Sequence, residues 1–194
     1  DVFAAPTLAP ASAAILVDDL NYRYSESAGI QEQLAYSTRG WHRLFWDLGI
    51  PVDFIEASQV SEQTAARYRV LVAPFPFAIP AATAERLARY AEAGGNLVSE
   101  ACPGRVDLGY AVRGELAPAL RTLFGSSQER LALVKEPNGH RWTPAEPPWS
   151  MYIEATRLIG TGRLAGCLLD AHLYLQSFRC DTSAPCLRSG ERVT

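Results

Sequence analysis

Cys102 is the residue in this sequence best suited to act as a nucleophile. It follows the strand expected at residues 96–99, where the chain would turn into a loop or helix. A nucleophilic cysteine needs a histidine that favours the thiolate, here His172 or His140, and a backbone N–H that binds the oxyanion. The next residue is Pro103, which has no N–H to donate. We therefore expect no catalytic residues, and a cysteine-dependent amidohydrolase using Cys102 and His172 remains an alternative.

Acidic side chains also follow apolar runs. Asp18 and Asp19 come after the first run, and Glu100 comes after a later one. An acidic pair after a first strand holds Mg²⁺ in receiver domains, but those domains also need an aspartate after the third strand, where this chain has Pro74. We expect no metal and no cofactor. A crevice at Asp18, Asp19, Pro74 and Glu100 would suit a sugar or another small molecule, because ligands bind at the carboxyl ends of parallel strands.

Aromatic residues gather around the first strong helical pattern. Trp41 and Phe45 share a helix face, whereas Trp46 is rotated from Trp41 by about 140°, since each residue turns the helix by about 100°. Tyr22 and Tyr24 precede them in a polar segment that we expect to be a loop. Exposed clustered aromatics are typical of interfaces. We therefore take Tyr22, Tyr24, Trp41 and Trp46 as interface or binding candidates.

These residues lie between alternating strand and helix patterns, which predict a doubly wound α/β sheet. The pattern weakens beyond residue 137. We expect residues 1–13 to be a linker or the edge of a longer chain, 14–178 to be one α/β domain, and 179–194 to be a polar tail with a truncated final strand region. The expected strands are 14–17, 51–55, 68–74, 96–99, 131–134, 164–169, 172–178 and a start at 191–194 without a partner hairpin. The expected helices are 31–48, 81–93 and 116–124.

Composition limits the functional classes. The chain has 194 residues, a net charge of −3, 48% apolar and 20% charged residues, and scattered basic side chains. These values fit a soluble globular domain and give no support for a nucleic-acid or membrane partner. The cysteines form no CxxC pair, so zinc is not expected. Cys180 and Cys186 could form a disulfide in an oxidising compartment, but the cysteine pattern fits reduced thiols equally well, and we favour a cytoplasmic location.

The order and spacing of several segments resemble the trimerisation domain of family 42 glycoside hydrolases, the β-galactosidases. Residues 41–54 (WHRLFWDLGIPVDF) are similar to a characteristic stretch of that domain, and residues 68–74 and 94–101 are similar to its third and fourth strands. Residues 103–110 and 120–125 also fit, so that the resemblance covers about residues 14–136.

The resemblance implies a three-layer αβα sandwich, flavodoxin-like and of the class I glutamine amidotransferase type, without chemistry of its own. In that family the catalytic glutamates lie on a (β/α)₈ barrel, which needs at least about 200 residues and has no room in this chain. The implied function is a non-catalytic oligomerisation domain. Its expected partners are copies of itself in a trimer or a glycoside hydrolase barrel, and a galactoside is the ligand to test for the alternative of a sugar-binding module.

Overall fold

The structure is a computed structural model, and it describes residues 9–100, 103–107, 115–134, 151–153, 156–171, 174–189 and 192–193. None of the helices in these ranges is both long enough and apolar enough to cross a membrane. The elements are β1 (Ala13–Val17), α1 (Asp19–Ser27), α2 (Gln31–Asp47), β2 (Val52–Glu56), η1 (Ala57–Gln59), α3 (Thr64–Arg67), β3 (Val70–Ala73), α4 (Ala81–Glu92), β4 (Asn96–Ser99), α5 (Pro118–Phe124), β5 (Ser126–Val134), β6 (Met151–Ile153), β7 (Thr156–Gly160), η3 (Gly162–Leu164), β8 (Leu168–Ala171), β9 (Tyr174–Cys180), β10 (Leu187–Ser189) and β11 (Arg192–Val193).

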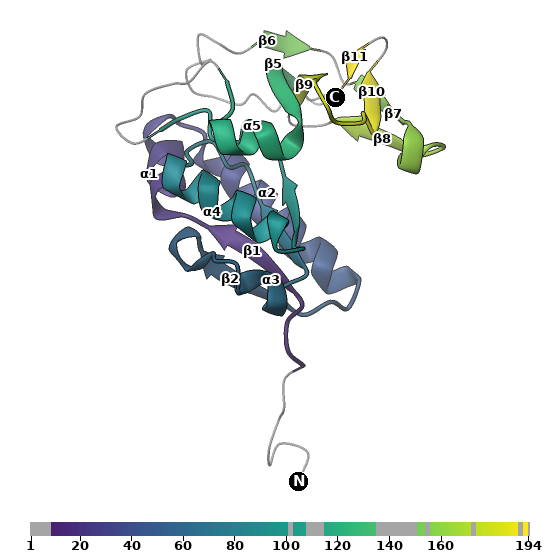
Figure 1. Cartoon of the computed structure of the whole chain (residues 1–194). Coiled ribbons are helices and arrows are strands. Elements are labelled where there is room, and N and C mark those ends of the chain that lie inside the picture. Colours follow the sequence, from purple (N-terminus) through teal and green to yellow (C-terminus); the bar gives the residue numbers. More distant parts are fainter. Residues whose placement is uncertain are drawn as a thin grey trace.

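A parallel sheet in the order β2-β1-β3-β4 forms the centre of the fold, with helices on both faces (Figure 1). Side chains alternate across β1: Ala13 and Ile15 pack with Phe45 of α2. Ala14 and Leu16 pack on the opposite face with residues of α4 and α5. A strand covered on both faces must be apolar throughout, which explains the continuous runs in the sequence. This arrangement confirms the expected αβα sandwich and the strands predicted at 14–17, 51–55, 68–74 and 96–99.

The predicted helices at 31–48, 81–93 and 116–124 correspond to α2, α4 and α5, but the loop expected before α2 is wrong. Helix α1 lies there, and it begins where Oδ1 of Asp18 accepts a hydrogen bond from the backbone N–H of Asn21 at 2.9 Å. Asn21 and Ser25 are both buried. Because polar residues occupy inward positions, α1 lacks the apolar stripe by which a helix is recognised in a sequence.

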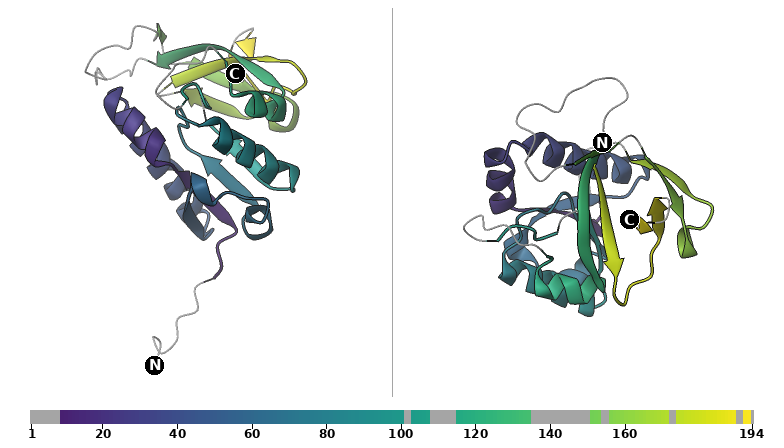
Figure 2. Two further views of the ribbon diagram at one scale, coloured as in Figure 1. Left: turned by 60° about the vertical axis from the view of Figure 1, so that its left-hand side comes forward. Right: turned by 90° about the horizontal axis from the view of Figure 1, so that it is seen from above.

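The strand expected at 131–134 is part of β5, but it does not extend the parallel sheet. β5 pairs antiparallel with β9, from Ser126 opposite Cys180 to Leu133 opposite Tyr174, and parallel with β6. Figure 2 shows β5 and β9 side by side above the α/β layers. Gly125 ends α5 in the left-handed conformation (φ 58°), so the chain turns directly into β5 without a crossover.

The C-terminal segment forms a further sheet in the order β11-β10-β7-β8. The strand expected at 164–169 is present but begins later: Gly162–Leu164 form η3, a turn follows, and β8 begins at Leu168. The prediction of a strand without a partner at the C-terminus is wrong: β11 pairs antiparallel with β10, which pairs with β7. The strand expected at 172–178 is confirmed as β9.

Gly125 attaches the chain after β9 to the end of α5. Its carbonyl oxygen accepts the backbone N–H groups of Asp181, Thr182 and Ser183 at 2.9, 2.9 and 3.1 Å. A Cβ at this position would lie 2.3 Å from Oγ1 of Thr182 and 3.0 Å from the nitrogen of Ser183. Both the positive φ and the close approach of this loop therefore require glycine.

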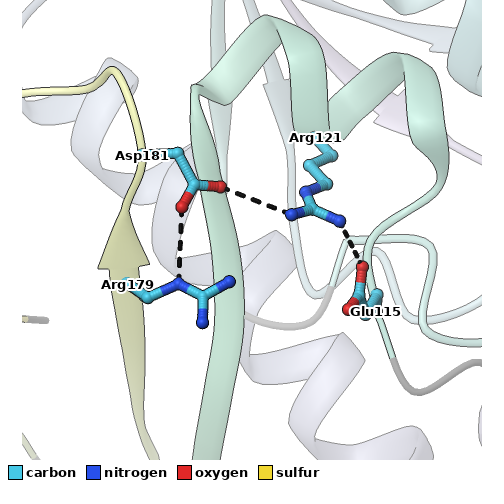
Figure 3. Close-up of polar contacts among 4 residues, drawn as sticks. All are labelled: Glu115, Arg121, Arg179 and Asp181. Atoms are coloured by element: carbon cyan, nitrogen blue, oxygen red, sulfur yellow. Dashed lines mark hydrogen bonds and ion pairs between the residues drawn. The ribbon is translucent and has the colours of Figure 1, made fainter.

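Charged side chains support the same junction (Figure 3). Arg121 of α5 lies 2.6 Å from Oε2 of Glu115 and 3.7 Å from Oδ2 of Asp181. The other oxygen of Asp181 lies 3.4 Å from Nε of Arg179. Each of these pairs is partly exposed and contributes little alone, so their main effect is to orient the loop against α5.

Tyr90 of α4 is fully buried beneath the sheet. Its hydroxyl donates a hydrogen bond to the carbonyl oxygen of Tyr68 at 3.0 Å. Its ring fills the space beside Gly95, where a Cβ would lie 2.2 Å from the ring. Burial raises the pKa of Tyr90 to about 12, although a hydrogen bond to the backbone of Asn96 acts in the opposite direction.

We predict that Gly125→Ala lowers the free energy of unfolding by roughly 1–3 kcal/mol, because alanine is strained at positive φ and its Cβ meets the docked loop. Gly40→Ala is the matched control, since Gly40 is exposed in α2 and a Cβ there would have nothing within 4 Å. The control should raise the free energy of unfolding by about 0.5–1 kcal/mol. Urea unfolding measures both, and a shift in the same direction for the two variants would contradict the role given to Gly125.

We predict that stability falls as the pH rises from about 10 towards 12. The unfolded chain releases the proton of Tyr90 near pH 10, whereas the folded chain holds it to about 12. The stabilisation is therefore complete below pH 10 and is lost above 12. Tyr90→Phe should unfold more easily at pH 8, because the carbonyl of Tyr68 loses its donor, but its stability should fall less between pH 10 and 12. Thermal unfolding across this range tests the difference, and parallel curves would refute it.

Candidate functional site

The carboxyl edge of the parallel sheet is where a fold of this kind binds ligands. Asp18 follows β1, Pro74 follows β3 and Glu100 follows β4, so the structure brings these three predicted residues to one edge. The segment between β3 and α4 crosses this edge, and residues 71–79 are all buried. The edge is therefore filled by the chain itself at the end of β3.

Glu100 holds this edge together. Its Oε2 accepts hydrogen bonds from the hydroxyl of Ser37 and from the backbone N–H of Phe75, the latter at 3.0 Å. Its Oε1 accepts a hydrogen bond from Nε1–H of Trp41. One carboxylate thus joins the end of β4 to α2 and to the turn after β3. Charge-assisted hydrogen bonds of this kind are about twice as strong as neutral ones.

Asn21 holds the same segment from α1. Its side-chain amide donates a hydrogen bond to the carbonyl oxygen of Phe75 at 3.0 Å, and its Oδ1 accepts the backbone N–H of Ala78 at 2.9 Å. Asn21 was not among the predicted site residues, because the segment that forms α1 was expected to be a loop. Its position three residues after Asp18 was the available signal, since that spacing matches a helix cap.

The sharp turn at this edge is centred on Phe75. Phe75 has φ 41°, and among the described residues it is the one non-glycine residue with positive φ. Hydrolases of related architecture place their nucleophile on such a strained turn after a strand. A phenyl ring has no nucleophilic atom, and it packs against Phe77 with ring centroids 4.9 Å apart. Cys102, His172 and His140, the alternative catalytic residues, lie outside the described residues.

The acidic pair after β1 makes local contacts. Asp18 caps α1, as described above, and Asp19 forms an ion pair with Arg23 at 2.7 Å on the exposed surface of α1. No group of three or more His, Cys, Asp or Glu side chains that could hold a metal occurs within the described ranges. The two acids therefore lie at the start of a helix, where carboxylates favour the positive end of the helix dipole.

The two predicted tyrosines of α1 have different surroundings. Tyr24 is buried and stacks on Phe77, with ring centroids 6.1 Å apart. Tyr22 is exposed and lines a pocket of about 350 Å³ between α1 and α2. Asp18 and Arg39 line the same pocket. Tyr22 is thus the tyrosine of the pair that a ligand or a partner can reach.

The two tryptophans of α2 also differ, as their helical spacing predicts. Trp41 faces inward and contacts Glu100, whereas Trp46 is 72% exposed. One turn before Trp46 on the same face, His42 stacks on Phe54 of β2 with ring centroids 5.8 Å apart. We call His42, Trp46 and Phe54 the α2 patch.

A second pocket, of about 380 Å³, lies between the end of β4 and the C-terminal strands. Glu100 and Pro103 line it from the α/β layers. Cys180 and Cys186 line it from the other side, and both are free thiols in this structure. This pocket joins the edge of the parallel sheet to the loop that docks on Gly125.

Together these features define a class: a flavodoxin-like α/β domain whose carboxyl edge is crossed by the buried segment after β3 and which carries added antiparallel strands. The family model described as the beta-galactosidase trimerisation domain matches residues 11–154, which is most of the chain. The chain therefore belongs to the beta-galactosidase trimerisation domain family.

Known proteins are similar to this chain over part of their length. Beta-galactosidase GanA of Bacillus subtilis is 33% identical over an alignment of 129 residues, and the match covers 61% of this chain and 18% of GanA. The fold is similar to that of Gan42B, a GH42 beta-galactosidase from G. stearothermophilus, with a TM-score of 0.72 at 20% identity over 94% of this chain and 24% of that one. A beta-galactosidase from Bacillus circulans sp. alkalophilus gives a TM-score of 0.72 at 17% identity, over 93% of this chain and 25% of that one. This chain thus spans a quarter or less of the length of these relatives.

We predict that Glu100→Gln lowers the free energy of unfolding by roughly 1–3 kcal/mol, because glutamine offers one acceptor oxygen to three donors. The emission of Trp41 should also change, since its indole loses a charged partner. Glu92→Gln, an exposed change in α4, is the control and should stay within about 0.5 kcal/mol. Chemical unfolding followed by tryptophan fluorescence measures both. Equal stability of the Glu100 and Glu92 variants would show that the carboxylate is not needed.

Proposed function

We propose that this chain is a non-catalytic oligomerisation domain that assembles into a trimer. The observation that carries the proposal is the α2 patch, where Trp46 is 72% and Phe54 is 50% exposed. Large aromatic side chains grouped on a surface are typical of protein interfaces. Membership of a trimerisation domain family agrees with a surface that binds other copies of the chain.

The carboxyl edge supports the non-catalytic part of the proposal. The turn that could present a nucleophile carries Phe75, and its backbone is tied to Glu100 and Asn21. The carboxylate of Glu100 accepts hydrogen bonds from three donors of the protein itself, so its role is to hold these segments together. The hydrogen bonds at this edge therefore favour a structural role for the domain over binding and conversion of a substrate.

We further propose that the domain works within a glycoside hydrolase of the β-galactosidase type. The relatives are named as β-galactosidases and are about four or more times as long as the segment they share with this chain. Hydrolysis of the glycosidic bond would then take place on a separate catalytic domain, and this domain would hold the subunits together.

We predict that the purified chain shows a concentration-dependent rise in mass towards a trimer, and that Trp46→Glu shifts this rise to concentrations at least tenfold higher. Truncating a central interface tryptophan typically costs more than about 2 kcal/mol. Tyr36→Glu is the matched control, because Tyr36 is 51% exposed on the same helix but rotated from Trp46 by about 80°. Multi-angle light scattering gives the masses, and circular dichroism confirms folding. A wild-type chain that stays monomeric at all concentrations would contradict the proposal.

A further inference from the structure

The pocket between α1 and α2 lies at the position where sheets of this kind bind small molecules. The chain runs from β1 to β2 on one side of β1 and then returns to β3 on the other side, so the connections diverge at β1 and β3. Ligands bind outside the carboxyl ends of the strands at such a point. The buried segment after β3 fills one half of it. The pocket of about 350 Å³ remains on the other half, where Val17 and Asp18 end β1 and line it.

The two charged side chains that line this pocket are not paired. Among the described residues, no ion pair joins Asp18 or Arg39 to each other or to another side chain. Asp18 uses one oxygen to cap α1, and Nε of Arg39 donates a hydrogen bond to the carbonyl oxygen of Ala35 at 3.1 Å. Asp19 and Arg23, which lie outside the pocket on α1, do pair with each other at 2.7 Å. The pocket therefore keeps one charge of each sign available to a ligand.

The remaining polar groups of the pocket include both donors and acceptors. The second oxygen of Asp18 accepts hydrogen bonds, the Nη groups of Arg39 donate them, and the side-chain amide of Gln31 does both. The guanidinium of Arg39 lies over the ring of Tyr36, 5.1 Å from the centroid, which orients it. Because a hydroxyl group both donates and accepts, a ligand with several hydroxyl groups can bind all three of these pocket side chains. The balance of charge favours a ligand that is itself neutral.

The apolar lining of the pocket requires a second property of the ligand. Val17, Leu34 and Ala35 are half-buried there, and Tyr22 presents an exposed ring at the same pocket. Aromatic rings of tyrosine bury apolar surface while their hydroxyl stays in water. The volume lies near the lower end of the range for small-molecule sites, roughly 300–1,000 Å³, so the pocket suits one small ligand. A pyranose ring has both properties, because C–H groups cover its faces and hydroxyl groups surround its edge.

We propose that the pocket between α1 and α2 binds a neutral monosaccharide in its pyranose form. One face of the sugar would lie against the ring of Tyr22, and its hydroxyl groups would join Asp18 to Arg39. The second pocket, beside β4, is less suited to such a ligand, because the carboxylate of Glu100 already accepts three hydrogen bonds. The inference goes beyond the proposed function, since assembly into a trimer requires no small molecule.

The test titrates methyl β-D-galactopyranoside, and separately methyl α-D-glucopyranoside, into the full chain and follows the backbone amide shifts by NMR. At least one sugar should give saturable shifts in α1 and α2 with a Kd on the order of millimolar, because small ligands gain little free energy per atom.

Variants of the pocket show whether the sugar binds there. Tyr22→Ala and Arg39→Ala should each raise the Kd by about tenfold, which corresponds to the loss of one good contact. Asp18→Asn keeps the oxygen that caps α1 but removes the charge, and it should also weaken binding. Arg43→Ala is the matched control, because Arg43 lies one turn further along α2, is paired with Asp47 and does not line the pocket. The control should bind as the wild type does, and the spectra show whether each variant is folded.

Four results would overturn the inference. The first is the absence of saturable shifts up to the solubility of both sugars, and the second is equal affinity of the wild type and the pocket variants. The third is an equal response to glycerol, which would show only a general effect of hydroxyl groups. The fourth is binding of L-leucine in place of the sugars, which would assign the pocket to a zwitterion.

The Trp46→Glu variant separates this inference from the proposed function. Trp46 lies seven residues after Arg39, about 10 Å along α2, and does not line the pocket. The variant should therefore bind the sugar as the wild type does. Binding by a chain that never associates would support the inference while the proposed function fails, and association without binding would do the reverse.

Discussion

The carboxylate of Glu100 is the interaction on which the architecture of the carboxyl edge depends. Phe75 holds a positive φ, which is unfavourable for a bulky side chain and persists only where the surroundings enforce it. Glu100 binds the N–H of this residue and Asn21 binds its carbonyl oxygen, so both sides of the turn are fixed. Because Ser37 and Trp41 bind the same carboxylate, the orientation of α2 is fixed together with the turn.

This constraint has a consequence for the outer surface of α2. The inward position of Trp41 sets the rotation of the helix, and the rotation sets which residues face solvent. With about 100° per residue, His42 then lies against Phe54 at the edge strand, and Trp46 is exposed to solvent. The interior hydrogen bond of one tryptophan and the exposure of the other are therefore two results of the same geometry.

The sequence allowed the parallel unit to be predicted almost completely, because strands buried on both faces and amphipathic helices have strong periodic patterns. It placed Glu100 at the correct edge of the sheet, but not its partners, since Ser37 and Trp41 lie about sixty residues earlier and only the fold brings them near. Helix α1 was missed because Asn21 faces inward. The antiparallel pairing of β5 was missed because the direction of a strand is not encoded in its own periodicity, but in the turn at Gly125 that precedes it.

The attachment of the C-terminal strands follows a different physical rule from that of the α/β layers. Where β5 and β9 pair, the buried side chains include Ser126, Ser127, Gln176 and Ser177. These serine and glutamine side chains release less apolar surface from water than the leucine and alanine side chains buried around the parallel sheet. Hydrogen bonds and ion pairs therefore help to fix how the C-terminal strands attach, and several of them lie at Gly125. Three backbone N–H groups bind the carbonyl of Gly125 while Arg121 orients Asp181 beside them. The attachment of the loop after β9 to the α/β layers therefore depends on the conformation of a single glycine at the end of α5.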